Sequence, residues 1–252
     1  MSSGPESVPA TREGALAEAR RILAAPTRVA VLTGAGMSTE AGVPDFRSPG
    51  GLYSEDFHGL HPEDVLSRDF LALQPELFYE YLRTRLAIHA EPDASYRRLA
   101  DLERAGRIAA VVTQNIDGLH TAAGSRNVIE AHGTLARFSC AACGRAHDAG
   151  RMMAPGTPIR CECGGLIRPD VVLYGEGLAA LDRAFATVDD AEALLVLGSS
   201  LVVHPIAGLV PAFLDAGRPV VIVNLQPTPY GRAPGVVELH ASIGATLGPL
   251  FD

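Results

Sequence analysis

The stretch RVAVLTGAGMSTEAG, residues 28–42, joins a short apolar run to a glycine-rich turn. Residues 28–32 have the length and apolar side chains of a strand that is buried in a parallel sheet. Gly34 and Gly36 then allow a tight turn in which backbone N–H groups can approach a phosphate. A helix that begins near Ser38 would point its positive end toward the same place. This order of elements predicts a dinucleotide site.

Apolar runs of the same kind recur along the chain and alternate with amphipathic segments. We expect strands at residues 28–32, 108–113, 193–197 and 219–224, shorter strands at 128–130 and 236–239, and helices at 13–25, 92–105 and 178–188. This alternation predicts an α/β fold, a doubly wound parallel sheet of the Rossmann-like type with helices on both faces. Because Gly42 lies too far along the chain for the dehydrogenase fingerprint, we expect dinucleotide binding without hydride transfer.

Two segments depart from this alternation. Residues 56–91 have helical spacing but no strand, which indicates a helical insertion. Residues 138–166 hold all four cysteines and too few apolar residues for a core of their own. This indicates a small module that must be stabilised by a cross-link between its cysteines. The Rossmann-like domain then comprises residues 1–55, 92–137 and 167–252, and the polar residues 1–12 form a disordered tail.

The cysteines form two close pairs, Cys140 with Cys143 and Cys161 with Cys163. Two such pairs on facing turns can supply a tetrahedral sulfur cage for zinc, and two disulfides are the other possibility. The N-terminal residues lack the apolar core of an export signal, so we expect a cytoplasmic protein with reduced thiols and one zinc ion. Four thiolates leave no open position on the metal, so its predicted role is structural.

Charge and composition exclude several partners and mechanisms. The net charge is −8, and all 21 basic residues are Arg. An acidic chain is not expected to bind nucleic acid or an anionic membrane, and the absence of Lys argues against a P-loop and a Schiff-base enzyme. Residues 193–214 carry no charge over a length that could span a bilayer, but the turn residues at 198–200 and His204-Pro205 interrupt them.

Polar residues cluster where the predicted strands end, and the loop after the glycine turn adds an aromatic side chain between opposite charges. Ligands of doubly wound folds bind at the carboxyl ends of the strands, so we expect these clusters to converge on one crevice. The clusters are residues 113–120, His132 with Gly133, residues 198–200, Asn224, and the loop residues Asp45, Phe46 and Arg47.

The order of these motifs resembles that of the sirtuin family, from about residue 28 to about residue 226. The matching motifs are residues 34–38 (GAGMS), 44–47 (PDFR), 113–117 (TQNID), 132–133 (HG), the cysteine pairs, 168–170 (RPD), 174–176 (YGE), 198–200 (GSS) and 223–224 (VN). The resemblance implies an NAD-dependent protein-lysine deacetylase, in which the acetyl group of acetyl-lysine ends on ADP-ribose and nicotinamide is released.

The resemblance also implies a role for each matched residue. His132 matches the general base that takes a proton from a ribose hydroxyl, and Asn115 is the second residue to which we give a catalytic role. Asn115 and Asp117 match the nicotinamide pocket, Gln114 matches a ribose contact, and Phe46 matches the aromatic residue that keeps water from the reacting ribose carbon. The predicted NAD set is Gly34, Ala35, Gly36, Asp45, Phe46, Arg47, Gln114, Asn115, Asp117, Gly198, Ser199, Ser200 and Asn224, and the four cysteines hold the zinc.

An acetylated protein substrate is expected to bind as an extended peptide that pairs with residues 171–175 and with a strand near Gly208. Family members that prefer succinyl or malonyl groups carry Tyr and Arg three residues apart. Here Leu82 follows Tyr79 at that distance, and Arg83 points about 100° further around the helix. We therefore expect an uncharged acyl group such as acetyl. The predicted substrate residues are Val171, Tyr174, Gly175 and Tyr79.

Three other functions could use the same NAD-binding residues. A mono-ADP-ribosyltransferase would pass ADP-ribose to a protein side chain, and a deacylase could act on longer uncharged acyl groups. A non-enzymatic NAD sensor is disfavoured because binding alone does not require the base His132. The oligomeric state is not readable from the sequence, so a monomer is the default expectation.

Overall fold

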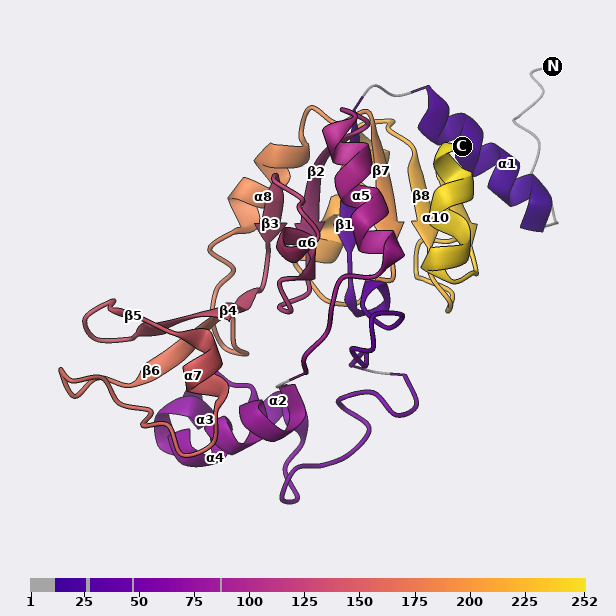
Figure 1. The fold of residues 1–252 in the computed structure, drawn as a ribbon. Coiled ribbons are helices and arrows are strands. Elements are labelled where there is room, and N and C mark those ends of the chain that lie inside the picture. The colour runs from indigo at the N-terminus through magenta and orange to yellow at the C-terminus, as the bar shows by residue number, and fades with distance from the viewer. Residues whose placement is uncertain (1–11, 26–27, 47, 87) are drawn as a thin grey trace, which may run out of the picture.

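The computed structural model describes residues 12–25, 28–46, 48–86 and 88–252, which form a large α/β lobe and a smaller lobe (Figure 1). Six strands form the sheet of the large lobe in the order β3-β2-β1-β7-β8-β9, and each neighbouring pair is parallel. They are β1 (Val29–Thr33), β2 (Ile108–Thr113), β3 (Val128–Glu130), β7 (Ala193–Leu197), β8 (Val220–Val223) and β9 (Val236–Leu239). The predicted parallel sheet is confirmed.

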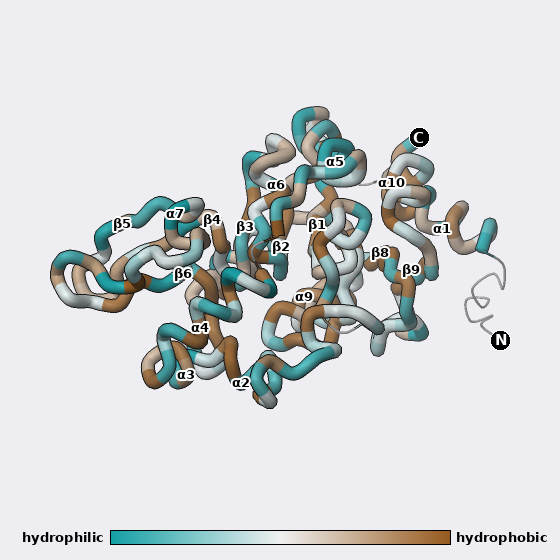
Figure 2. The backbone as a smooth tube through the Cα atoms, turned by 60° about the horizontal axis from the view of Figure 1, so that its bottom comes forward, coloured by the Kyte–Doolittle hydropathy of each residue, from teal (hydrophilic) through white to brown (hydrophobic). Residues whose placement is uncertain are grey.

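Helices cover both faces of this sheet because its central strands are apolar on both sides. Every residue of β1, β7 and β8 is buried, and Figure 2 shows mostly hydrophobic residues along β1 and β8. One face packs against helices that contribute Leu23, Tyr96 and Leu247, and the other against helices that contribute Ala184 and Phe213. The first group comprises α1 (Arg12–Ala24), α5 (Ala94–Arg104), α6 (Leu119–Ala122) and α10 (Ile243–Phe251), and the second α8 (Leu181–Val188) and α9 (Leu209–Asp215).

The smaller lobe joins two segments that are far apart in the sequence around one hydrophobic core. Phe78, Tyr79 and Leu82 share this core with Phe138 and Ile167. The lobe contains an antiparallel sheet in the order β5-β4-β6. The helical character predicted for residues 56–91 is confirmed, whereas the division of the chain into three units stays a prediction. The elements are α2 (Pro62–Val65), α3 (Arg68–Leu73), α4 (Pro75–Tyr81), a π-helical segment (Leu82–Leu86), β4 (Gly133–Cys140), β5 (Ala146–His147), α7 (Ala149–Met153) and β6 (Ile167–Val171).

The turn after β1 differs from the prediction. Within the described residues 28–46 no α-helix begins near Ser38; Ala35–Met37 form a 3-10 turn, and further turns lead to Pro44. Gly42 has a φ of +87°, and Pro44 has no N–H to donate, so a helix could not be continued here. The expected helix N-terminus at the phosphate site is therefore wrong.

Three smaller predictions can be compared with the structure. Residues 1–11 of the predicted tail lie outside the described residues, and Arg12, which we counted with the tail, begins α1. Residues 193–214 form β7, a 3-10 turn (Ile206–Gly208) and most of α9, and no helix in the described part of the chain is long and apolar enough to cross a membrane. Gly208 lies in that 3-10 turn, so the expected strand near it is wrong.

Candidate active site and metal centre

A cavity of about 830 Å³ lies at the carboxyl ends of the sheet strands and extends to the smaller lobe. Its walls come from the turns after β1, β2, β7 and β8 and from the helices and β6 of the smaller lobe. The strand order reverses at β1, whose neighbours β2 and β7 lead to opposite edges of the sheet. Ligands of open α/β sheets bind at such a switch point. At least one residue of each predicted strand-end cluster lines this cavity.

Most of the predicted NAD and substrate residues line this cavity. Asp117 and Tyr79 are not among the lining residues, and Arg47 lies outside the described residues. The lining residues that were predicted are Gly34, Ala35, Gly36, Asp45, Phe46, Gln114, Asn115, His132, Val171, Tyr174, Gly175, Gly198, Ser199, Ser200 and Asn224.

The glycine turns after β1 and β7 pack directly against each other. The N–H of Gly34 donates to the Leu197 carbonyl (3.0 Å), and the N–H of Gly36 donates to the Gly198 carbonyl (2.9 Å). A Cβ on Gly198 would lie 2.3 Å from the Met37 nitrogen, and the φ of Gly198 is +62°. Glycine is thus required for close packing of the two turns. Contrary to expectation, the N–H groups of Gly34 and Gly36 are engaged by the protein itself.

His132 follows β3 and is partly buried beside the chain that leaves β2. Its Nδ1 lies 3.0 Å from the Gln114 carbonyl oxygen. A carbonyl only accepts, so the neutral ring carries its proton on Nδ1 and leaves Nε2 as a proton acceptor. Burial lowers the pKa of His132, and the hydrogen bond to the Gln114 carbonyl opposes part of this shift. A neutral imidazole at neutral pH suits a general base.

The side chain of Gln114 is only half satisfied by the protein. Its Oε1 accepts a hydrogen bond from Ser199 Oγ (2.8 Å), whereas its buried Nε2 has no partner among the described residues. A buried donor without an acceptor is costly, and such groups in native structures usually await a water or a ligand. The cavity therefore fits a ligand that presents a polar oxygen next to Gln114.

A buried polar cluster lies behind Asn115. Asn115 Nδ2 donates to the Gly34 carbonyl (3.0 Å) and to Ser38 Oγ (2.9 Å). Asp117 accepts from Ser38 Oγ (2.7 Å) and from the Leu119 N–H (3.0 Å). Burial raises the pKa of Asp117, and these hydrogen bonds oppose the rise. Asp117 thus contacts the Ser38 hydroxyl, which holds Asn115, and does not itself line the cavity.

The loop after the glycine turn places Phe46 in the cavity wall. The Asp45 carboxylate accepts from the N–H (2.8 Å) and the hydroxyl (2.5 Å) of Ser48, which fixes a turn. The ring of Phe46 meets the ring of Tyr53 edge-on, with centroids 5.1 Å apart. Asp45 therefore shapes the loop that carries Phe46.

The end of the cavity that the smaller lobe encloses is apolar. Phe78, Leu82 and Leu86 line it from the helical insertion. Tyr79 faces another way: it is buried and its hydroxyl donates to the Ile167 carbonyl (2.9 Å). Arg83 also points away, since it donates to the Met152 and Thr157 carbonyls and stacks on Tyr79. The expectation that Arg83 lies outside the acyl site agrees with this geometry.

The smaller lobe also holds the segment after β6. The N–H of Tyr174 donates to the Leu66 carbonyl, and the Tyr174 carbonyl accepts from the Arg68 N–H, each at 3.0 Å. The exposed Tyr174 hydroxyl lies 3.1 Å from the Tyr53 hydroxyl and 3.3 Å from a Glu63 carboxylate oxygen. Tyr174 thus joins the segment after β6 to both the Phe46 loop and the helical insertion.

Sequence reasoning missed part of the cavity wall. Glu40 accepts a hydrogen bond from the Gly244 N–H (3.1 Å), which joins the first turn to the start of α10. The sequence pattern that could have predicted this wall is a strand, β9, followed by a short turn with Ser242 and then a helix. This pattern again places a turn at the carboxyl end of a strand. The missed lining residues include Thr39, Glu40, His204, Leu225, Gln226, Ala241, Ser242 and Ile243.

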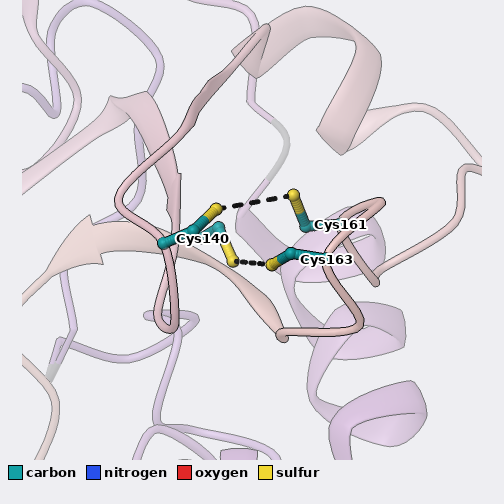
Figure 3. A group of neighbouring side chains, drawn as sticks. Cys140, Cys161 and Cys163 are labelled. Atoms are coloured by element: carbon teal, nitrogen blue, oxygen red, sulfur yellow. Dashed lines mark hydrogen bonds between the residues drawn. The ribbon is translucent and has the colours of Figure 1, made fainter.

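The four cysteines meet in the smaller lobe (Figure 3). Their sulfur atoms all lie within 4.8 Å of one another; the Cys140–Cys163 distance is 3.5 Å and the Cys143–Cys161 distance is 3.8 Å. A tetrahedral zinc ion with four thiolates requires sulfur atoms about 3.8 Å apart. All four are free thiols, so the arrangement fits zinc and not two disulfides, and the short Cys-x-Cys spacing still brings Cys163 to the cluster.

Fold and site together define an α/β nucleotide-binding protein with a four-cysteine lobe. Residues 34–205 match the family model described as the Sir2 family, so the chain belongs to the Sir2 family, the sirtuins.

Relatives cover most of the chain. An NAD-dependent protein deacetylase of Cutibacterium acnes is 50% identical over 220 residues, which is 85% of this chain and 88% of the relative. An NAD-dependent protein deacetylase of Staphylococcus aureus is 45% identical over 218 residues, 84% and 88% of the two chains. A solved structure described as "Structural Basis for the Mechanism and Regulation of Sir2 Enzymes" has a TM-score of 0.84 at 36% identity and covers 94% of this chain and 96% of its own. One described as "Sir2-p53 peptide-NAD+" has a TM-score of 0.78 at 36% identity and covers 90% and 92%.

Proposed function

We propose that this protein is an NAD-dependent protein-lysine deacetylase that transfers the acetyl group of acetyl-lysine to ADP-ribose and releases nicotinamide and O-acetyl-ADP-ribose. The observation that carries the proposal is the meeting of His132, Gln114 and Asn115 in one cavity, in a chain whose relatives are NAD-dependent protein deacetylases. Solved relatives contain NAD+ with a p53 peptide, and 2′-O-acetyl-ADP-ribose with a deacetylated p53 peptide. NAD is accordingly the co-substrate.

His132 acts as the general base in this proposal. NAD, when bound, supplies the ribose carbon that the acetyl oxygen attacks as nicotinamide leaves. Nε2 of His132 then takes the proton of a ribose hydroxyl, for which its lowered pKa and the Nδ1 hydrogen bond to Gln114 prepare it. Phe46 excludes water from the reacting carbon, because a water there would hydrolyse the activated sugar.

The NAD site in this proposal comprises the turns at the strand ends. Gln114 Nε2 donates to a ribose oxygen, which satisfies its buried N–H, and Asn115 contacts the nicotinamide carboxamide. Asp117 contributes through Ser38 and not by direct contact. The remaining members are Gly34, Ala35, Gly36, Asp45, Arg47, Gly198, Ser199, Ser200 and Asn224.

One zinc ion, held by the four cysteines, has a structural role in this proposal. Cys140 and Cys161 are buried in the core of the smaller lobe, so the metal joins two loops to that core. Four thiolates fill the tetrahedral shell and leave no position for water or substrate.

The acetylated protein binds as an extended peptide along the segment after β6, with Val171, Tyr174 and Gly175 beside it. Arg168 and Glu176 support this segment through a partly buried bidentate ion pair, with N–O distances of 2.5 and 2.9 Å. The acyl-lysine enters the apolar end of the cavity. Tyr79, which we predicted as a substrate residue, supports this wall from behind.

Longer uncharged acyl groups are a second candidate substrate class. The observation that favours them is the apolar wall of Phe78, Leu82, Leu86 and Leu135, which gives a longer chain surface to bury. The same wall offers no cation to a succinyl or malonyl carboxylate.

We also propose a cytoplasmic monomer that binds no nucleic acid. The net charge of −8 supports the absence of a nucleic-acid partner, and four cysteines without a disulfide support a reducing compartment; the monomer is the default assignment.

Mass spectrometry of an acetyl-lysine peptide incubated with and without NAD tests the function. We expect deacetylation only with NAD, together with nicotinamide and O-acetyl-ADP-ribose, and a folded but inactive His132→Ala variant. Turnover of His132→Ala near the wild-type rate would contradict the role of His132. ADP-ribose on protein with no loss of acetyl or longer acyl groups would replace the proposal by an ADP-ribosyltransferase.

A further inference from the structure

We propose that Tyr96 is a positioning residue for the nicotinamide end of the cavity, although it does not line the cavity. Its hydroxyl fixes Ser38, and Ser38 fixes the amide of Asn115 so that the amide oxygen is presented to the ligand. The inference rests on the proposed function, because it is that function that places nicotinamide next to Asn115. Tyr96 lies on α5, is fully buried and is not among the NAD residues assigned above.

The direction of each hydrogen bond in this cluster follows from its donors and acceptors. The Asp117 carboxylate accepts, so the single proton of the Ser38 hydroxyl points to it across 2.7 Å. Ser38 Oγ must then accept from its other two partners, which are Tyr96 Oη (2.7 Å) and Asn115 Nδ2 (2.9 Å). The Tyr96 hydroxyl is therefore the donor, and it stays protonated because burial raises the pKa of Tyr96 well above its ordinary value.

These bonds decide which end of the Asn115 amide meets the ligand. The two hydrogens of Nδ2 go to the Gly34 carbonyl and to Ser38, and Nδ2 has a longer contact of 3.5 Å with the Tyr96 hydroxyl, so Oδ1 is the end left for the cavity. A flipped amide would set Oδ1 against the Gly34 carbonyl, two acceptors at hydrogen-bond distance. The side-chain oxygen suits a ligand that presents N–H groups, as the carboxamide of nicotinamide does.

The position of Tyr96 is itself fixed by the core. Its ring meets the ring of His120 edge-on at 4.6 Å, and His120 Nε2 lies 2.9 Å from Thr33 Oγ1. Thr33 Oγ1 donates to Thr113 Oγ1 (2.8 Å), which accepts the Asn115 N–H (3.1 Å). Backbone and side chain of Asn115 are thus both anchored in one buried network, and Tyr96 is its link to α5.

The substitution Tyr96→Phe tests this role because it removes only the hydroxyl. Tyr81→Phe is the matched control: Tyr81 is equally buried, its hydroxyl has no partner in the described part of the chain, and it does not line the cavity. For both variants we would measure the nicotinamide inhibition constant, the KM for NAD and the KM for an acetyl-lysine peptide. NAD affinity would also be measured by calorimetry, which requires no turnover.

For Tyr96→Phe we expect the nicotinamide inhibition constant to rise about fivefold, the factor that corresponds to one net hydrogen bond. The KM for the peptide should stay within about twofold of the wild type, as should every constant of Tyr81→Phe. Unchanged nicotinamide inhibition, or an equal rise in both KM values, would overturn the proposal, because a general distortion of the cavity weakens the binding of both substrates. A mere loss of folded protein lowers the maximal rate and leaves KM unchanged.

Ser38→Ala and the double variant separate positioning from packing. If Tyr96 acts through Ser38, adding Tyr96→Phe to Ser38→Ala causes no further weakening of nicotinamide inhibition. Additive effects would overturn the proposal. If Tyr96→Phe is poorly folded, Ser38→Ala alone decides the matter, because it removes the same link to Asn115 and unchanged nicotinamide inhibition would overturn the proposal. Should the wild type bind NAD without deacetylating the peptide, the proposed function fails, and the role of Tyr96 is then judged by the calorimetric NAD affinities.

Discussion

At the scale of single residues, a partly buried and a fully buried histidine show how surroundings set the behaviour of one side chain. His132 lines the cavity and keeps one nitrogen available as a proton acceptor. His120 is deep in the core against Tyr96 and Thr33, and burial lowers its pKa to about 3. The first histidine can therefore take part in catalysis, whereas the second packs inside the core and affects how the fold responds to acid.

The pH dependence of deacetylation should reflect His132. Burial favours the neutral ring, so the base stays active below the ordinary histidine pKa of 6.5. We expect the acid limb of kcat/KM to have its midpoint below 6.5, measured with an acetyl-lysine peptide at low NAD. A midpoint at or above 6.5, in protein shown to stay folded over that range, would mean that His132 is not the base or is not buried during turnover.

The buried His120 should make the fold sensitive to acid. The unfolded chain binds a proton at this residue below about pH 6.5, whereas the folded chain does so only near pH 3, so stability is complete above pH 6.5 and is lost as pH falls toward 3. Between about pH 7.5 and about pH 5 this residue alone should lower the free energy of unfolding by about 2 kcal/mol. Urea titrations of the wild type and of His120→Gln should differ by this amount, and parallel pH profiles would contradict it.

At the scale of elements, sequence predicted the strands well because β1, β7 and β8 are uninterrupted apolar runs whose burial needs no knowledge of their neighbours. The turn after β1 was mispredicted for the opposite reason. The N–H groups of Gly34 and Gly36 are engaged by carbonyls of the distant β7 turn, and no local pattern records that contact. The α10 wall of the cavity was missed likewise, since Glu40 meets Gly244 only in the folded chain.

The π-helical segment after α4 should control acyl selectivity through Leu82. Leu82 is buried in the apolar wall, so Leu82→Arg places a cation where a succinyl carboxylate could pair with it and an acetyl group could not. We expect the ratio of kcat/KM for succinyl-lysine to that for acetyl-lysine to rise at least about tenfold, the equivalent of one ion pair. The ratio is independent of the folded fraction; Leu82→Met is the size-matched control, and an unchanged ratio would remove Leu82 from the acyl site.

At the scale of the whole molecule, the four-cysteine cluster and the helical insertion share one hydrophobic core. Residues 138–166 were predicted to lack a core of their own, and the structure gives them a shared one, because Phe138, Cys140 and Cys161 pack with the helical insertion. The sequence could not reveal this partnership, since it joins segments separated by the strands β2 and β3. Cys140 and Cys161 belong to that core, whereas Cys143 and Cys163 are exposed beside it, so the proposed zinc ion would join the exposed pair to the core.

Loss of zinc should therefore disable the acyl site as well as the loops that carry the four cysteines. We expect Cys140→Ala to bind less than one zinc per chain by elemental analysis and to lose most deacetylase activity, because zinc binding here contributes to folding. Ala141→Ser, a change in the same turn that removes no ligand, should keep the metal and the activity. A metal-free Cys140→Ala protein that unfolds cooperatively and turns over normally would show that the cage is dispensable.

The shared core also limits how this enzyme could be redesigned. The wall formed by Phe78 and Leu82 rests on β4 and β6, so residues 56–91 grafted from a relative of different preference would lack the surface that shapes them. Residues 133–171 would have to be transferred with them. Acyl preference and metal binding therefore depend on the same two segments of the chain, which would have to be exchanged together.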